Sequence, residues 1–92
     1  MTPEQIDEQI AKIEKTCGHS SVWITHRSVV IDYTNWRGER SERVIMPIRI
    51  EFVATKWHPE AQWLVEAHCG ESGTVKSFAM AGMNAPWKAV LS

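Results

Sequence analysis

The sequence lacks the features that mark several large classes of protein. Its 92 residues leave no room for a second hydrophobic core, so we expect a single domain. Two cysteines, Cys17 and Cys69, are too few for a disulfide scaffold and suit reduced thiols. No stretch approaches the roughly 20 apolar residues of a membrane span, and residues 1–5 do not resemble a signal peptide. We therefore expect a cytoplasmic protein with no membrane partner.

The chain also carries little net charge. Eleven acidic residues oppose ten lysines and arginines, which gives a formal charge of −1. Proteins that coat nucleic acid by bulk electrostatics are basic, so the composition argues against that class. Any nucleic-acid site must be a local patch, and a compact ligand or a protein partner fits the balance better than a long nucleic acid.

Motifs for catalysis and for metal binding are absent from the sequence as well. It has no glycine-framed nucleophilic serine and no glycine-rich phosphate loop, so we expect no enzyme activity and no cofactor. Cys17 and His19, with His68 and Cys69, are the one combination that invites a zinc interpretation. Neighbours on a strand, such as His68 and Cys69, point to opposite faces, so we expect no metal.

A helix is predicted at the start of the chain. Thr2 fits an N-cap, with Pro3 at the first helical position and Gln5 at the capping-box position. Gly18 ends the pattern, so we assign residues 1–18 to this helix. Its apolar stripe consists of Ile6, Ile10 and Ile13. Such a stripe is typical of a helix that docks on its own domain, and a seam for a homo-oligomer or a protein partner is the alternative.

Beyond the helix the apolar period changes to two, which is typical of strands. The predicted strands cover residues 29–33, 43–52, 63–69 and 75–80. Short antiparallel strands in succession form a meander, which must curl to cover its apolar face. We therefore expect an all-β fold, in which one N-terminal helix precedes a small antiparallel β-barrel at residues 19–83. A short tail follows at residues 84–92.

The long second strand is predicted to have two distinct faces. Alternation places one apolar row at Val44, Met46, Ile48, Ile50 and Phe52. The other face carries Arg43 and Arg49, with Pro47 between them. Because proline donates no ladder hydrogen bond, Pro47 predicts an edge or a bulge. On the third strand, Trp63 alternates with apolar residues and is predicted to lie in the core.

Five short segments occur in an informative order. They are Ile31-Asp32-Tyr33, Gly38-Glu39-Arg40-Ser41-Glu42-Arg43-Val44, Pro47-Ile48, Trp63-Leu64-Val65-Glu66-Ala67 and Lys76-Ser77-Phe78. This order resembles the WYL domain, whose pattern has a tyrosine, a glycine turn, and an arginine and a proline on the second strand. A Trp-Tyr-Leu signature on the third strand and an Arg-x-Phe on the fourth complete that pattern. The resemblance covers about residues 29 to 83.

The resemblance implies an Sm-like or SH3-like β-barrel that senses ligands, often derived from nucleic acid, in bacterial regulators. The usual family member has a helix-turn-helix domain upstream, whereas the residues before the first strand here predict one helix and a linker. The chain therefore resembles a stand-alone WYL-like protein of bacterial or phage type. It departs from the pattern at Leu64, which replaces the signature tyrosine, and at Lys76, which replaces an arginine and lacks its planar fork.

Three basic and two aromatic residues form the candidate ligand site. Arg43 and Lys76 lie near the starts of their strands, and Arg49 lies further along the predicted face of Arg43. Together they predict a basic patch at the barrel rim that binds phosphate. The rings of Tyr33 and Trp36 are available there to stack a base.

Other interpretations of these residues stay open at this point. Arg43 and Lys76 can be solvated or paired with the nearby acids Glu39, Glu42 or Glu66. Trp36 and a second loop aromatic, Trp57, can instead close the barrel ends. The leading hypothesis is a ligand-sensing or regulatory module that binds a nucleotide, an oligonucleotide or single-stranded nucleic acid. The rival is a protein–protein interaction module of SH3-like fold.

Overall fold

Two helices precede the sheet in the computed structural model, which describes residues 1–56 and 59–90. Helix α1 (Pro3–Cys17) begins with the expected capping box between Thr2 and Gln5. It ends at Gly18, whose φ of 75° is a left-handed conformation that glycine adopts without strain. Helix α2 (Ser21–Arg27) follows. No described helix is long and apolar enough to cross a membrane.

The expectation of a single helix before the strands is wrong. Helix α2 has seven residues, and Ile24 is the one that is buried. A helix of about two turns shows no periodic apolar stripe, so its sequence resembles a linker. The signal that marks it is Ser20, whose side chain accepts a hydrogen bond from the amide of Trp23 at 3.3 Å.

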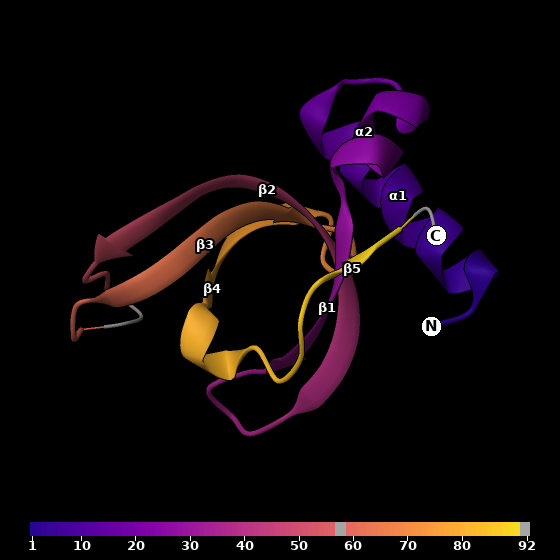
Figure 1. The fold of residues 1–92 in the computed structure, drawn as a ribbon. Coiled ribbons are helices and arrows are strands. Elements are labelled where there is room, and N and C mark those ends of the chain that lie inside the picture. Colours follow the sequence, from indigo (N-terminus) through magenta and orange to yellow (C-terminus); the bar gives the residue numbers. More distant parts are fainter. Residues whose placement is uncertain (57–58, 91–92) are drawn as a thin grey trace.

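Five antiparallel strands form one strongly bent sheet (Figure 1). They are β1 (Val29–Thr34), β2 (Arg40–Val53), β3 (Gln62–Cys69), β4 (Thr74–Ala79) and β5 (Lys88–Ala89). The order across the sheet is β4-β3-β2-β1-β5. A 3-10 helix, η1 (Met80–Gly82), follows β4 along the chain.

The sheet is open, so the expected closed barrel of the Sm-like or SH3-like type is wrong. Closure would require β4 to bond to the opposite edge, where β5 pairs with only two residues of β1. Instead the chain leaves the strand conformation at η1. The hydroxyl of Tyr33 accepts a hydrogen bond from the amide of Ala79 at 3.1 Å, and an isolated bridge joins Tyr33 to Met83. The Tyr33 side chain and the Tyr33–Met83 bridge thus take the place of the strand pairing that would close the sheet.

Strand β2 belongs to two ladders. Its first part pairs with β1 as far as Ile45, and its second part pairs with β3 from Ile45 onward. The register shifts between Pro47 and Arg49, which confirms the bulge that the proline predicts. Because the bulge adds one residue, Arg49 lies on the opposite face of the sheet from Arg43. The predicted alternation along this strand is therefore wrong beyond the bulge.

The two faces of the sheet carry separate cores. The inner face, on the concave side of the bend, holds Ile31, Tyr33, Ile45, Val65, Ala67, Cys69 and Phe78. The outer face carries the two helices, and its core consists of Ile10, Ile13, Ile24, Val30, Val44 and Met46. The segment between η1 and β5 runs along the open side of the bend, and Trp87 from this segment packs against the inner core (Figure 1).

Helix α1 docks closely on the sheet. Its Gln9 side chain accepts a hydrogen bond from the amide of Val44 at 2.8 Å, and the amide of Gly70 donates to the carbonyl of Val44 at 2.8 Å. A Cβ atom added at Gly70 would lie only 2.5 Å from the Cβ of Gln9. Ile10 and Ile13 are buried beneath the helix. The apolar stripe of α1 therefore packs on its own sheet and is not left free for another copy.

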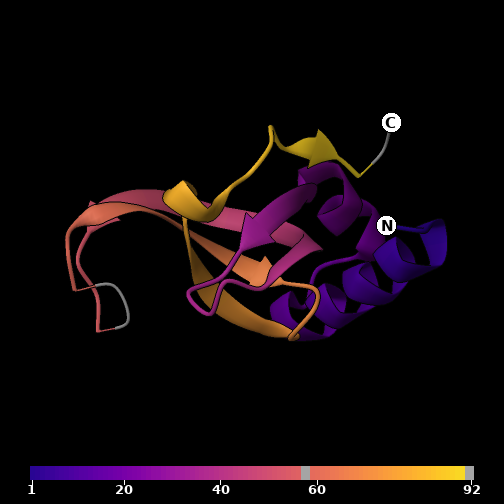
Figure 2. The same cartoon turned by 90° about the horizontal axis from the view of Figure 1, so that it is seen from below.

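The end of the β2–β3 hairpin projects from the body of the domain (Figure 2). We call this projection, residues 48–53 and 62–66, the distal ribbon. Its Trp63 is 55% exposed and lies against Phe52, with ring centroids 5.3 Å apart. The prediction that Trp63 lies in the core is wrong. Trp63 does share a face with Val65, as expected. The β3–β4 ladder begins only at Leu64, however, so no residue of β4 lies beside Trp63.

Replacement of Gly70 by alanine should destabilise the domain by about 1–3 kcal/mol, because the new methyl group would overlap Gln9 of α1. Chemical denaturation measures the loss. Ser77→Ala, a comparably small change at an exposed position of β4, should stay within about 0.5 kcal/mol of the wild type. Equal stabilities of the Gly70 variant and the wild type would show that α1 does not dock as described.

Two aromatic truncations should differ sharply in their effect on unfolding. Phe78 is 1% exposed in the inner core, so Phe78→Ala should cost about 3–5 kcal/mol. Trp63→Ala should cost clearly less, because more than half of its surface is exposed and its pair with Phe52 adds only about 0.5–1.5 kcal/mol to the area that it buries. Urea titrations of both variants compare them directly. A loss at Trp63 as large as that at Phe78 would mean that the distal ribbon is packed in solution.

Candidate ligand-binding face

Arg43 is a buried cation on the inner face. It is 8% exposed, and strand β2 places it opposite Ile31 of the inner core. Its Nε donates to the hydroxyl of Ser41 at 3.2 Å and lies 3.4 Å from a carboxylate oxygen of Glu71. Its partner is therefore Glu71, and none of the acids considered from the sequence.

Two aromatic rings hold the guanidinium of Arg43 in place. The central carbon of the guanidinium lies 5.5 Å from the ring centroid of Tyr33 and 6.0 Å from that of Phe78. The hydrogen bond to Ser41 and the ion pair with Glu71 both use Nε, and the two Nη atoms hydrogen-bond to no residue within the described ranges. Arg43 thus presents a positioned fork whose two end nitrogens are available as donors.

Tyr33 supports Arg43 rather than offering a free ring. It is 6% exposed, and its ring meets that of Phe78 edge to face with centroids 5.2 Å apart. Its hydroxyl is already bonded to the amide of Ala79. A base therefore has no open face of Tyr33 on which to stack.

Lys76 lies on the same face as Arg43. Strand β4 places it opposite Ala67 of the inner core, and its side chain is exposed. Within residues 1–56 and 59–90 it forms no ion pair and no hydrogen bond through its ammonium group. No contact joins it to Arg43 in the described part of the chain, so the structure brings the two cations to one face without bringing them together.

Arg49 lies on the other side of the sheet. The bulge places it opposite Glu66 on the outer face, where its guanidinium pairs with Glu51 and with Glu66, the latter at 2.8 Å. The three basic residues predicted to converge at one rim are therefore divided between two faces. The signal in the sequence was Pro47, whose bulge reverses the order of faces for every residue after it.

Trp36 is the most exposed of the large apolar side chains, at 84%. It lies in the turn between β1 and β2, with the guanidinium of Arg37 5.0 Å from its ring centroid. The structure describes no contact between Trp36 and Arg43 or Lys76. Trp57 lies outside the described residues.

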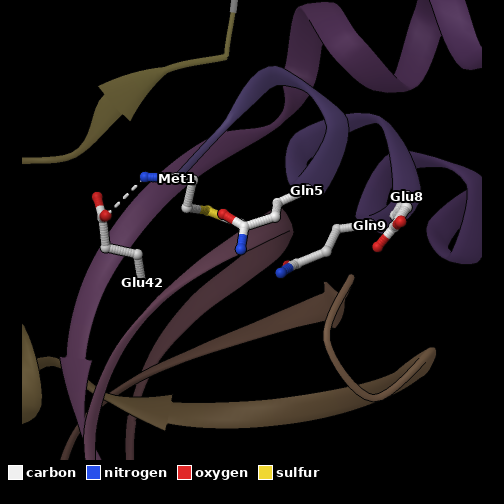
Figure 3. Close-up of a pocket in the computed structure, with 5 residues that line it drawn as sticks. All are labelled: Met1, Gln5, Glu8, Gln9 and Glu42. Atoms are coloured by element: carbon white, nitrogen blue, oxygen red, sulfur yellow. Dashed lines mark hydrogen bonds and ion pairs between the residues drawn. The ribbon is translucent and has the colours of Figure 1, made fainter.

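A polar hollow of about 390 Å³ lies between the start of α1 and strand β2 (Figure 3), and none of these cations lines it. It is lined by Met1, Gln5, Glu8, Gln9 and Glu42. The amino group of Met1 donates to Glu42 at 2.9 Å. With two carboxylates and no lysine or arginine in its lining, the hollow does not suit a phosphate.

On the outer face, Arg40 binds Asp32 with both ends of its fork. Its Nε and Nη2 donate to the two carboxylate oxygens at 2.9 and 2.8 Å. These hydrogen bonds lower the pKa of Asp32 to about 2, and a further one from Asn84 at 3.2 Å acts in the same direction. Asn84 thereby ties the segment after η1 to strand β1.

The sequence predicted Arg43 and Tyr33 as site residues but not Phe78 or Glu71, which also contact the guanidinium. Phe78 lies two residues after Lys76 on β4 and so shares its face, which is the signal in the sequence for its contact with Arg43. Glu71 follows Gly70 in the β3–β4 turn and carries no pattern that predicts its partner. Such a contact depends on how the turn folds back over the sheet.

The model of the WYL domain family matches residues 20–86, which is most of the chain. The chain belongs to the WYL domain family. The match includes α2 and the first four strands but leaves α1 outside it. Membership places this WYL domain among regulatory, ligand-sensing domains.

A solved structure is also similar to this WYL domain. It is the proteasome accessory factor B/C (PafBC) of Arthrobacter aurescens, with a TM-score of 0.49, 21% sequence identity and coverage of 92% of this chain. The domain spans only 11% of the length of that chain. No curated protein matches this WYL domain.

The two departures from the family pattern have different positions in this WYL domain. Leu64, in place of the signature tyrosine, is 3% exposed and lies on the outer face, because its neighbours Trp63 and Val65 point inward. Lys76, in place of an arginine, lies on the inner face with Arg43. Only the change at Lys76 therefore bears directly on the face that carries the free donors.

Replacement of Arg40 by alanine should raise the pKa of Asp32 towards its ordinary value of about 3.8. The lowered pKa means that ionised Asp32 stabilises the wild type above about pH 4, and that this contribution is lost as the pH falls towards about 2. The Arg40→Ala variant should lack this pH-dependent contribution to stability. An NMR titration of the Asp32 carboxyl group, with thermal midpoints across the same range, checks both expectations.

Arg37→Ala is the control for this titration, because Arg37 contacts Trp36 rather than Asp32. It should leave the pKa of Asp32 unchanged. An Asp32 pKa that stays at about 2 in Arg40→Ala would instead assign the shift to Asn84.

Proposed function

We propose that this WYL domain is a ligand-sensing or regulatory binding module without enzyme activity, and that its ligand carries a phosphate. A nucleotide or the end of a single-stranded oligonucleotide fits this description. The observation that carries the proposal is the state of Arg43, whose guanidinium lies over the rings of Tyr33 and Phe78 while its Nη atoms hydrogen-bond to no described residue. A planar fork of this kind binds phosphate through two parallel hydrogen bonds.

The surroundings of Arg43 favour exchange of one anion for another. Glu71 is half exposed, and its oxygen lies 3.4 Å from Nε, longer than the 2.7–2.9 Å of a strong charge-assisted hydrogen bond. Ser41 holds Nε independently of Glu71. A ligand phosphate can therefore occupy the Nη atoms while the orientation of the side chain is kept.

The distribution of the other cations supports a compact ligand. Lys76 is the second cation of the inner face and has no acidic partner among the described residues. The arginines of the outer face are engaged, Arg40 with Asp32 and Arg49 with two glutamates. Few phosphates can be neutralised at once, which agrees with a net charge of −1.

The aromatic residues take different roles in this proposal. Tyr33 orients the guanidinium, because its ring is buried beneath it. Trp36 is exposed and is the ring on this hairpin that can stack a base.

The rival function, a protein–protein interaction module, has one observation in its favour. Ile50, Phe52 and Trp63 of the distal ribbon are 51%, 60% and 55% exposed, which is unusual for side chains of this size. These residues lie beyond the bulge, away from Arg43 along β2. The two functions therefore depend on different residues and can be separated by substitution.

Fluorescence anisotropy with a labelled single-stranded oligonucleotide tests the proposed function, with nucleoside monophosphate and inorganic phosphate as competitors. Arg43→Lys keeps the charge but loses the fork, so affinity should fall by about tenfold. Lys76→Ala should weaken binding and reduce the slope of log affinity against log salt by about one. The wild-type slope should itself be shallow.

Arg49→Ala is the matched control, since it removes an arginine of the same chain from the opposite face. It should leave the affinity unchanged. Thermal midpoints of all variants verify that they are folded. Equal affinities of the wild type and the Arg43→Lys, Lys76→Ala double variant, or no binding by either, would refute the proposal and leave the interaction module ahead.

A further inference from the structure

Strand β2 has a long free edge. On the side that faces β1, its pairing ends at Ile45, while on the other side it pairs with β3 as far as Val53. Between residues 46 and 53 that edge meets no other strand in the described part of the chain. The same stretch forms the upper margin of the projecting hairpin in Figure 1. Its unpaired backbone groups are a template for a further strand.

The side chains along this edge are apolar and exposed. Ile48, Ile50 and Phe52 are 47%, 51% and 60% exposed. Free edges are commonly protected by lysine, by proline and bulges, or by a short strand, and here Pro47 and the bulge interrupt the edge only as far as Arg49. Strand β4, at the margin of the sheet, carries Lys76 near its middle. The β2 edge has no such lysine between residues 46 and 53.

The sequence of this edge is complementary to itself. Suppose that two copies pair antiparallel with Ile50 of one opposite Ile50 of the other. A residue a given number of positions before Ile50 then lies opposite the residue the same number of positions after Ile50 in the partner subunit. Arg49 then lies directly opposite Glu51 of the partner subunit, and Glu51 opposite the partner's Arg49. Ile48 and Phe52 face each other in the same way, so both charge and apolar character match.

In the monomer the two charges beside Ile50 pair with each other. Arg49 and Glu51 lie on the outer face of β2, one residue to either side of Ile50, and they pair within one chain. Glu66 of β3 also binds Arg49, at 2.8 Å, on the side of β2 away from the free edge, so Arg49 has to turn from Glu66 towards the second copy on association. A two-fold axis through position 50 turns one such intrachain pair into two cross-strand pairs.

We infer that two copies of this chain associate through the free edge of β2, pairing antiparallel around Ile50 and joining their sheets into one. The occupant of the edge is a second copy, because in the antiparallel arrangement the base before Ile50 of each copy lies opposite the acid after Ile50 of the other. Residues directly opposite each other in a strand pair share a face. The inner faces of the two copies, with Arg43 and Lys76, therefore lie on the same side of the joined sheet.

Sedimentation velocity over a concentration series, without ligand, tests the inference by charge reversal. The wild type should show a concentration-dependent dimer. In Arg49→Glu each strand presents two acids to its counterpart, and in Glu51→Arg it presents two bases, so each variant alone should dimerise at least about tenfold more weakly. An equimolar mixture of the two variants should form a dimer again, because every cross-strand pair then joins opposite charges.

The mixture also controls for folding, since only folded edges can restore the contact. Arg37→Glu, a charge reversal in the exposed β1–β2 turn, should dimerise like the wild type. A wild type that stays monomeric throughout the series would overturn the inference. So would a dimer that both reversals leave unchanged, since it would use another surface, or a mixture of folded variants that stays monomeric.

Discussion

The peptide groups of Val44 are the point on which the arrangement of this domain depends. Strand β3 turns away from β2 here, and its last bond to β2 is the one from Gly70 to the Val44 carbonyl. The Val44 amide would be left unpaired, but Gln9 of α1 accepts its hydrogen. A helix thus completes a strand ladder, which buries the stripe of α1 on the outer face and leaves the inner face to Arg43.

Patterns in the sequence correctly predicted the structural features that depend on interactions between neighbouring residues. The capping box at Thr2, the period of two in four strands and the bulge at Pro47 all depend on neighbouring residues. Whether the sheet closes depends on the two distant edges meeting, and no pattern in β4 or β5 encodes that. Alternation also says which face a residue shares but not how far that face is covered, which is why Trp63 was misplaced.

The candidate site was predictable in its residue types but not in its geometry. Arg43 and Lys76 share a face because each lies two residues from an inner-core residue of its own strand, Ile45 and Phe78 respectively. Arg49 does not, because one extra residue before it reverses the order of faces. The partner that partly neutralises Arg43, Glu71, comes from a turn 28 positions later, and its approach depends on the bend of the whole sheet.

Ile48 occupies a distinct position in strand β2. It is the extra residue of the bulge, so β3 has no residue of its own opposite it. Deleting it would leave Pro47 opposite Ala67 and Arg49 opposite Glu66, and so every cross-strand neighbour on both sides of the bulge would be retained. A chain one residue shorter at this point of β2 would therefore keep its β2–β3 pairs in register without the bulge.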